Sequence, residues 1–166
     1  VEEEAIELIG KLSDGGMRDS VSLLDQLTAY TMDKITVNDV NDVYGTITEQ
    51  EINELLTLIF NNKLSNVFDL ITQYDEDGKN LTKIIETIIE FLKNTLIYYN
   101  SSEYFDNEDK KKLYKEMCNL ITEDQIYNTI ESKHINKARK KYEYEENYGI
   151  SFELRAAAVF RSLRAG

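Results

Sequence analysis

The residues best suited to chemistry lie in a short turn, Gly15-Gly16, followed at once by Met17 and Arg18. Two glycines permit a tight turn, and the apolar spacing that follows predicts a helix beginning at Met17. A helix N-terminus carries unsatisfied N–H groups, and an arginine in its first turn adds a guanidinium that can meet phosphate oxygens in pairs. Arg18 is therefore a candidate phosphate contact, with Gly16 permitting close approach. The alternative is an ordinary turn with a surface pair between Arg18 and Asp19.

A single cysteine and a single histidine are the other residues that could carry chemistry. Cys118 lies in LYKEMCNLI on an apolar spacing, so we expect a buried structural thiol. A nucleophilic thiol would need a low pKa and a neighbouring base. His134 lies in a polar stretch, and we expect a surface side chain. The sequence therefore predicts no catalytic residue and no metal ligand.

Helices must position these residues, because nothing in the sequence has the alternation of a strand. The chain has 166 residues, of which 42% are hydrophobic, with seven glycines and no proline. This composition allows long uninterrupted helices. We predict an all-α fold, with a short helical unit over residues 1–46 and a five- or six-helix bundle over residues 47–166. Apolar spacing predicts helices over residues 1–12, 17–30, 37–43, 48–61, 64–74, 80–99, 107–120, 122–142 and 151–163.

The same spacing predicts which side chains face inward. In the helix over residues 17–30 we expect burial of Val21, Leu23, Leu24 and Leu27. In the two helices that open the bundle we expect burial of Ile52, Leu55, Leu56, Ile59, Val67, Leu70, Ile71 and Tyr74. The stretch 80–99 is the most apolar and predicts a central helix covered on several sides. Its inward positions are Leu81, Ile84, Ile85, Ile88, Ile89, Leu92, Leu96 and Ile97.

Several helix ends have recognisable signals. Thr36 or Asn38 is a plausible N-cap for the short helix over residues 37–43, and Gly45 ends that helix as a C-cap glycine would. Thr48 followed three residues later by Glu51 is the pattern of a capping box.

The chain is acidic, with 19 Lys and Arg against 31 Asp and Glu and a formal net charge of −12. Binding to DNA depends on neutralising phosphates with Lys and Arg, so this balance disfavours direct DNA contact. It also disfavours an anionic membrane surface, and we expect a cytoplasmic protein with no membrane partner. The basic clusters Lys110-Lys111-Lys112 and Lys137–Lys141 fit solvated helix faces. The alternatives are contacts to DNA or to an acidic neighbouring subunit.

The segment SDGGMRDSVSLLDQ, Ser13–Gln26, resembles the sensor-2 lid helix of the tau/gamma family of bacterial DNA polymerase III subunits. These subunits are AAA+ ATPases of the clamp loader. The resemblance continues into ITVNDV and VYGT, which are similar to the end of the family's lid domain. Beyond Ile47 only the helical pattern is similar. The resemblance implies that residues 1–46 are the end of a lid domain and residues 47–166 are an oligomerisation collar.

In that family the lid arginine touches the γ-phosphate of ATP held in an adjoining nucleotide domain. The resemblance therefore implies this role for Arg18, with Gly16 beside it, and ATP as the cofactor of the full-length subunit. The full-length subunit resembles an ATPase within the DNA polymerase III holoenzyme, a DNA-directed DNA polymerase. This chain alone has no G-x-x-x-x-G-K-[ST] loop and no acidic strand for Mg²⁺. Alone, it should therefore neither hydrolyse ATP nor bind metal.

The leading hypothesis is an oligomerisation and nucleotide-sensing fragment of a clamp-loader subunit that helps load the sliding clamp on DNA during replication. The implied partners are tau/gamma, delta and delta-prime subunits, with DNA and the sliding clamp reached only indirectly. One alternative is a nucleic-acid-binding helical module that uses Lys137–Lys141. Another is the C-terminal oligomerisation domain of a different AAA+ ATPase.

Overall fold

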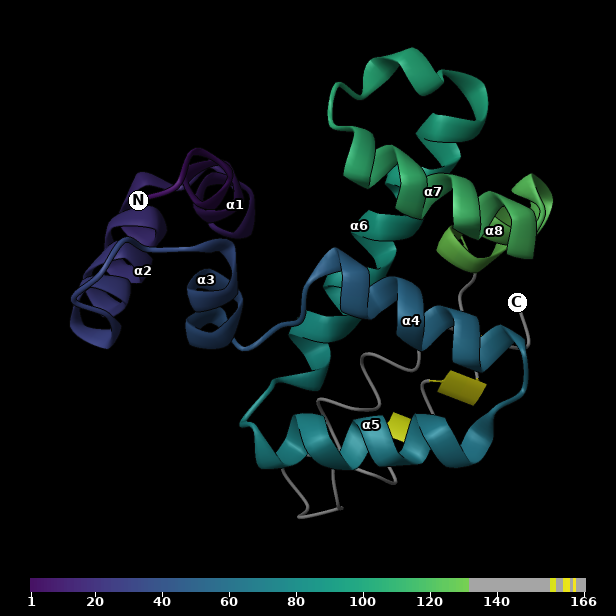
Figure 1. The fold of residues 1–166 in the computed structure, drawn as a ribbon, viewed down its shortest axis with the longest axis horizontal. Helices are drawn as coiled ribbons and strands as arrows, with labels where there is room; N and C mark the ends of the chain where they lie inside the picture. The colour runs from purple at the N-terminus through teal and green to yellow at the C-terminus, as the bar shows by residue number, and fades with distance from the viewer. Residues whose placement is uncertain (132–155, 158–159, 162, 164–166) are drawn as a thin grey trace. The chain divides into compact units, whose positions relative to one another are not determined.

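The computed structural model describes residues 1–131, 156–157, 160–161 and 163, and these residues form helices and connecting loops without any strand (Figure 1). The prediction of an all-α fold is confirmed. The helices are α1 (Glu3–Leu12), α2 (Met17–Tyr30), α3 (Val37–Tyr44), α4 (Glu49–Phe60), α5 (Leu64–Glu76), α6 (Leu81–Asn100), the 3₁₀ helix η1 (Ser102–Tyr104), α7 (Glu108–Leu120) and α8 (Glu123–Glu131). Beyond α8, the described residues 156, 157, 160, 161 and 163 are also helical.

The chain divides into two compact units, Val1–Thr48 and Glu49–Gly166. Helices α1 to α3 form the first unit, and α4 to α8 belong to the second. The sequence places a division after residue 46, and its assignment of the two parts to a lid and a collar stays a prediction.

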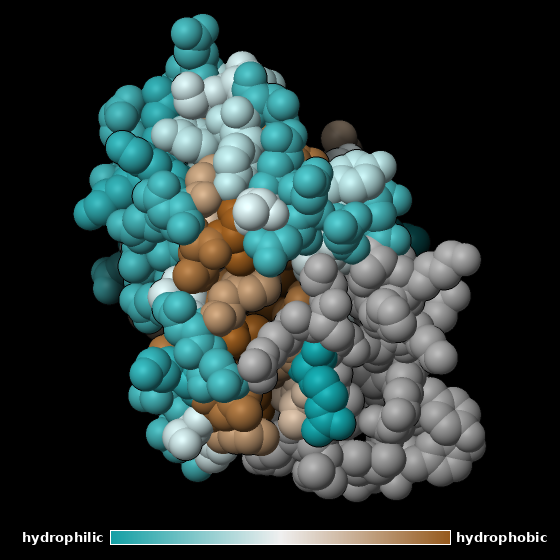
Figure 2. Space-filling model, turned by 90° about the vertical axis from the view of Figure 1, so that its right-hand side faces the viewer, coloured by the Kyte–Doolittle hydropathy of each residue, from teal (hydrophilic) through white to brown (hydrophobic). Residues whose placement is uncertain are grey.

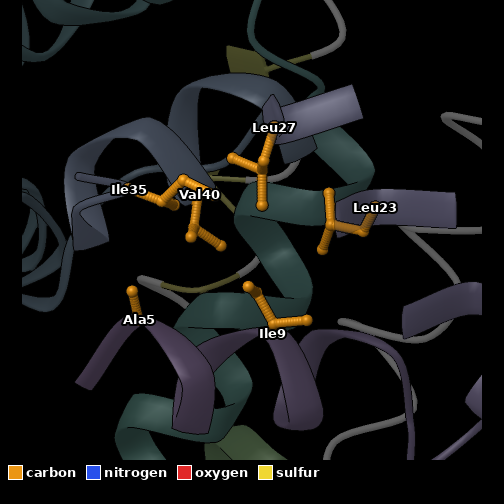
Figure 3. Close-up of a cluster of buried hydrophobic side chains, with 6 residues drawn as sticks. All are labelled: Ala5, Ile9, Leu23, Leu27, Ile35 and Val40. Carbon is orange, nitrogen blue, oxygen red and sulfur yellow. The ribbon is translucent and has the colours of Figure 1, made fainter. Parts of the chain in front are cut away.

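The first unit has a small core of its own. Helices α1, α2 and α3 pack against one another, and six side chains from these helices and from the loop before α3 point toward one another between the helices (Figure 3). These are Ala5, Ile9, Leu23, Leu27, Ile35 and Val40. The predicted burial of Val21 and Leu24 is wrong, since they are 52% and 38% exposed. Within the first unit, α2 has only α1 and α3 to cover it, so one narrow stripe of its surface is enclosed.

Helix α3 begins and ends where the sequence predicts. The Thr36 hydroxyl accepts a hydrogen bond from the Asp39 N–H at 3.3 Å, and the Asp39 carboxylate accepts from the Thr36 N–H at 2.8 Å. This reciprocal pair is a capping box, which satisfies two N–H groups that the helix leaves free. Gly45 ends α3 in the left-handed region with φ of 89°. The capping box at Thr48 stays a prediction.

The second unit is built around α6, as the sequence predicts for its most apolar stretch. Helix α6 packs against α4, α7, α8 and η1, while α4 packs against α5, α6 and α7. Leu81, Ile84, Ile85, Ile88 and Leu92 are all buried. They recur at the three- and four-residue spacing that keeps them on one face of a helix.

The inward prediction for α6 fails at Ile97, which is 38% exposed. At 100° per residue, Ile97 lies on the side of α6 opposite to Leu81 and Ile88. The buried face continues instead through Phe91 and Thr95. In α4 all four predicted inward positions are buried, whereas Leu70 of α5 is only partly buried.

Large apolar side chains are also exposed on the second unit. Leu64 and Phe68 of α5 are 50% and 47% exposed, and Tyr127 of α8 is 55% exposed. Figure 2 shows hydrophobic residues gathered in a band on the face that it draws, with hydrophilic residues along its left side. None of the helices in the described part of the chain has the length and apolar content needed to cross a bilayer.

Candidate functional site

The turn between α1 and α2 has the hydrogen bonds of a Schellman motif, in which a helix ends on a left-handed residue. The Asp14 N–H donates to the Lys11 carbonyl at 3.1 Å, and the Gly15 N–H donates to the Gly10 carbonyl at 3.3 Å. Both Asp14 and Gly15 have positive φ, at 49° and 69°. Aspartate tolerates this conformation better than most residues do, because its short side chain can hydrogen-bond locally. The sequence predicted a turn here, but it did not predict that Asp14 would adopt a left-handed conformation together with Gly15.

Gly16 opens α2 in an extended conformation, with φ of −75° and ψ of 114°. Its N–H donates to the Ser13 carbonyl at 2.8 Å, and no side chain caps the helix. A Cβ added to Gly16 would lie 3.1 Å from the Ser13 carbonyl oxygen and 3.3 Å from Oδ2 of Asp19. The position is therefore fitted to glycine. The first-turn N–H groups of α2 have no partner within the helix.

Arg18 is exposed in this first turn of α2. In the described part of the chain it forms no ion pair, with Asp19 or with any other residue. The structure therefore brings together a free guanidinium and the N-terminus of a helix, both of which favour an anion. The contact of Arg18 and Gly16 with ATP stays a prediction.

The other candidate residues do not assemble into a site. Cys118 is half-buried rather than buried as predicted, and desolvation raises the pKa of its thiol to about 11, which disfavours the reactive thiolate. Lys111 pairs with Glu108 of its own helix at 3.3 Å. No group of three or more His, Cys, Asp and Glu that could hold a metal occurs within the described ranges. His134 and Lys137–Lys141 lie outside them.

Comparison with known proteins bears on the same segment. Residues 1–33 match the family described as the ATPase lid domain of the DNA polymerase III clamp loader subunit. The chain is 26% identical over 162 residues to DNA polymerase III subunit tau of Bacillus subtilis, which covers 96% of this chain and 28% of that protein. The chain is a relative of the DNA polymerase III tau/gamma subunits.

Two further proteins are similar to this chain. DNA polymerase III subunit gamma/tau of Mycoplasma genitalium is 22% identical over 152 residues, which covers 91% of this chain and 24% of that protein. Replication factor C small subunit of Staphylothermus marinus is 31% identical over 87 residues, covering 50% and 26% of the two chains. The chain thus spans about a quarter of the length of these relatives. The resemblance carried by Ser13–Gln26 is confirmed.

Proposed function

We propose that this tau/gamma-related chain is the nucleotide-sensing and assembly portion of a clamp-loader subunit, acting in loading of the sliding clamp on DNA. The observation that carries the proposal is the lid-domain match over residues 1–33. That segment contains α1, the glycine turn and the first turn of α2 with Gly16 and Arg18.

In this proposal Arg18 reads the γ-phosphate of ATP bound by another domain of the same subunit. Its exposure and its lack of an ion pair in the described chain leave the guanidinium available. Gly16 keeps the approach to the helix N-terminus open, because a side chain there would crowd Ser13 and Asp19. ATP binding then draws the first unit toward the phosphate, and the movement rearranges neighbouring subunits.

The second unit supplies assembly in the proposal, joining tau/gamma, delta and delta-prime subunits through the helical bundle. Support comes from the exposed apolar side chains of α5 and α8, including Leu64, Phe68 and Tyr127. A specific interface buries at least about 1,000 Å², so several such residues would have to contribute together. DNA and the sliding clamp are reached through the assembled ring.

The first test is assembly. The complete polypeptide that contains this chain, mixed at micromolar concentration with delta and delta-prime subunits, should co-elute with them in gel filtration. Absence of a complex would remove the collar assignment. Self-association without those subunits would favour the oligomerisation domain of another AAA+ ATPase.

The second readout of the same assembled loader is its response to nucleotide. Arg18→Ala removes a charge-assisted contact worth about 1.5–3 kcal/mol. The ATP concentration needed for clamp loading should therefore rise roughly 10- to 150-fold. Lys11→Ala removes the same charge from the last turn of α1 and serves as the matched control. An Arg18→Ala loader with the ATP dependence of the control would contradict nucleotide sensing by Arg18.

A further inference from the structure

A line of polar side chains runs from buried to exposed positions of the second unit, and we call it the polar seam: Glu49 and Asn53 of α4, Asn94 of α6, and Tyr114 and Glu116 of α7. Asn53, Asn94 and Tyr114 are buried, Glu49 is partly buried and Glu116 is exposed. The Tyr114 hydroxyl lies 3.1 Å from both carboxylate oxygens of Glu49. Asn94 donates to the Tyr114 hydroxyl at 3.4 Å, and Asn53 donates to Glu116 at 3.0 Å. The seam therefore ties the first two turns of α4 to α7, and its Tyr114 also reaches α6.

Burial makes these contacts specific. Tyr114 is 1% exposed, Asn53 is 6% exposed and Asn94 is 9% exposed. Desolvation and the neighbouring Glu49 carboxylate raise the pKa of Tyr114, so its hydroxyl remains a proton donor to Glu49. A buried polar group that loses its partner is costly, and neighbouring registers of α4 would break these pairs. The seam thus fixes where α4 lies along α7.

The seam begins at the point where the two units join. Glu49 is the first residue of α4 and of the second unit, and the segment from Gly45 to Thr48 connects it to α3. The other end of this connection is also held, because the N–H groups of Gly45 and Thr46 donate to the Asn41 carbonyl at 2.9 and 3.0 Å. The connecting segment is therefore short, and hydrogen bonds hold residues at both of its ends.

We propose that the polar seam anchors the first turn of α4, so that a rotation of the first unit is transmitted to the bundle instead of being lost by fraying of α4. This inference rests on the proposed function. Helix ends fray readily unless they are tied down, and coupling between distant sites needs stiff, connected elements. Glu49 and Tyr114 are then positioning residues for the response to ATP, without touching the nucleotide.

The test removes the Tyr114 hydroxyl and keeps the ring. Tyr114→Phe is compared with Tyr99→Phe, because Tyr99 lies in the same bundle and its hydroxyl is 2.7 Å from the carbonyl oxygens of Cys118 and Ile121. Both variants lose one hydrogen-bonded hydroxyl, but only the first loses a contact to α4. The complete subunit in the assembled loader is measured for ATP affinity and for clamp-loading rate at saturating ATP.

Tyr114→Phe should keep the ATP affinity of the wild type and lower the loading rate roughly 2- to 30-fold, the range expected for a residue on a coupling path. Tyr99→Phe should change neither quantity. Glu49→Ala should reproduce the loss without touching the aromatic ring, and Glu49→Gln should restore most of the rate because its amide oxygen still accepts from Tyr114.

Equal losses in Tyr114→Phe and Tyr99→Phe would mean general loosening of the bundle and would overturn the inference. A wild-type loading rate in both Tyr114→Phe and Glu49→Ala would overturn it as well. Failure of the proposed function would give a different result. In that case the loader with the wild-type chain would itself show no ATP-dependent clamp loading, so the seam variants could not differ from it.

Discussion

At the scale of single residues, the three glycines near the candidate site have different physical roles. Gly10 lies inside α1, and a Cβ added there would meet nothing within 4 Å. Gly15 has a φ of +69°, a conformation that L side chains rarely adopt. Gly16 has an ordinary φ but is crowded by a backbone oxygen and by the Asp19 carboxylate. Alanine substitutions at these three positions therefore test three separate effects on stability: loss of glycine flexibility at Gly10, left-handed backbone strain at Gly15 and steric crowding at Gly16.

We predict that Gly10→Ala stabilises the first unit, by about 0.4–1 kcal/mol, because it lowers the entropy of the unfolded chain without strain. Gly15→Ala should destabilise it by about 1–2 kcal/mol through left-handed strain. Gly16→Ala should also destabilise it, because the Ser13 carbonyl and Asp19 must move apart. Denaturant unfolding followed by circular dichroism measures all three differences.

Gly10→Ala is the internal control, since it adds the same methyl group to the neighbouring helix. If all three substitutions changed stability in the same direction, the described turn geometry would be wrong. A stable Gly16→Ala variant would in addition remove the argument that this position is fitted to glycine.

Sequence reasoning at this scale succeeds where the signal is local. It singles out Gly16 and Arg18 because a glycine turn and a first-turn arginine are neighbours in the chain. It does not find Glu49 and Tyr114, which are partners across 65 positions and become neighbours only when α4 packs on α7. The sequence around a single glutamate at a helix start does not indicate whether its carboxylate accepts a hydrogen bond from a buried side chain or faces solvent.

At the scale of elements, the helix ends were predictable for the same reason. Asn80 and Asn107 accept hydrogen bonds from the N–H groups of Lys83 and Lys110, three residues onward in each case. Such caps depend on residues within one turn. The faces were less predictable, as Val21 and Ile97 show, because apolar spacing does not reveal whether another element covers a stripe.

The capping box of α3 leads to a prediction about acid stability. The N–H and hydroxyl of Thr36 donate to the Asp39 carboxylate and hold its pKa below the usual value of 3.8. Since the folded pKa is depressed, the carboxylate stabilises the first unit above the unfolded pKa, and this contribution disappears as the pH falls through the folded pKa. Asp39→Asn should therefore be less stable than the wild type at neutral pH, with a difference that shrinks below pH 3.8.

Urea unfolding at neutral and acidic pH checks this result. Thr36→Ala removes the other half of the box and should lower stability by about 0.5–2 kcal/mol at neutral pH. The double variant should lose less than the sum of the two single changes, because one interaction cannot be lost twice. Strict additivity would mean that the two side chains do not act as a pair.

At the scale of the whole molecule, the chain holds two cores of unequal size. The first unit encloses a cluster of six buried residues, while the second surrounds α6 with several helices. A short unit buries a smaller fraction of its surface and is correspondingly marginal. We therefore expect the first unit to open more readily than the second.

Leu27→Ala tests whether the two cores are independent. Leu27 is 0% exposed in the first core, and its truncation should cost about 2–5 kcal/mol there. We expect amide hydrogen exchange in α1, α2 and α3 to become much faster, while α6 keeps its protection. Leu92→Ala, at a 0% exposed position of α6, should loosen the second unit with little change in the first. If Leu27→Ala accelerated exchange throughout α6, the units would unfold as one cooperative body, and the two cores would not be independent.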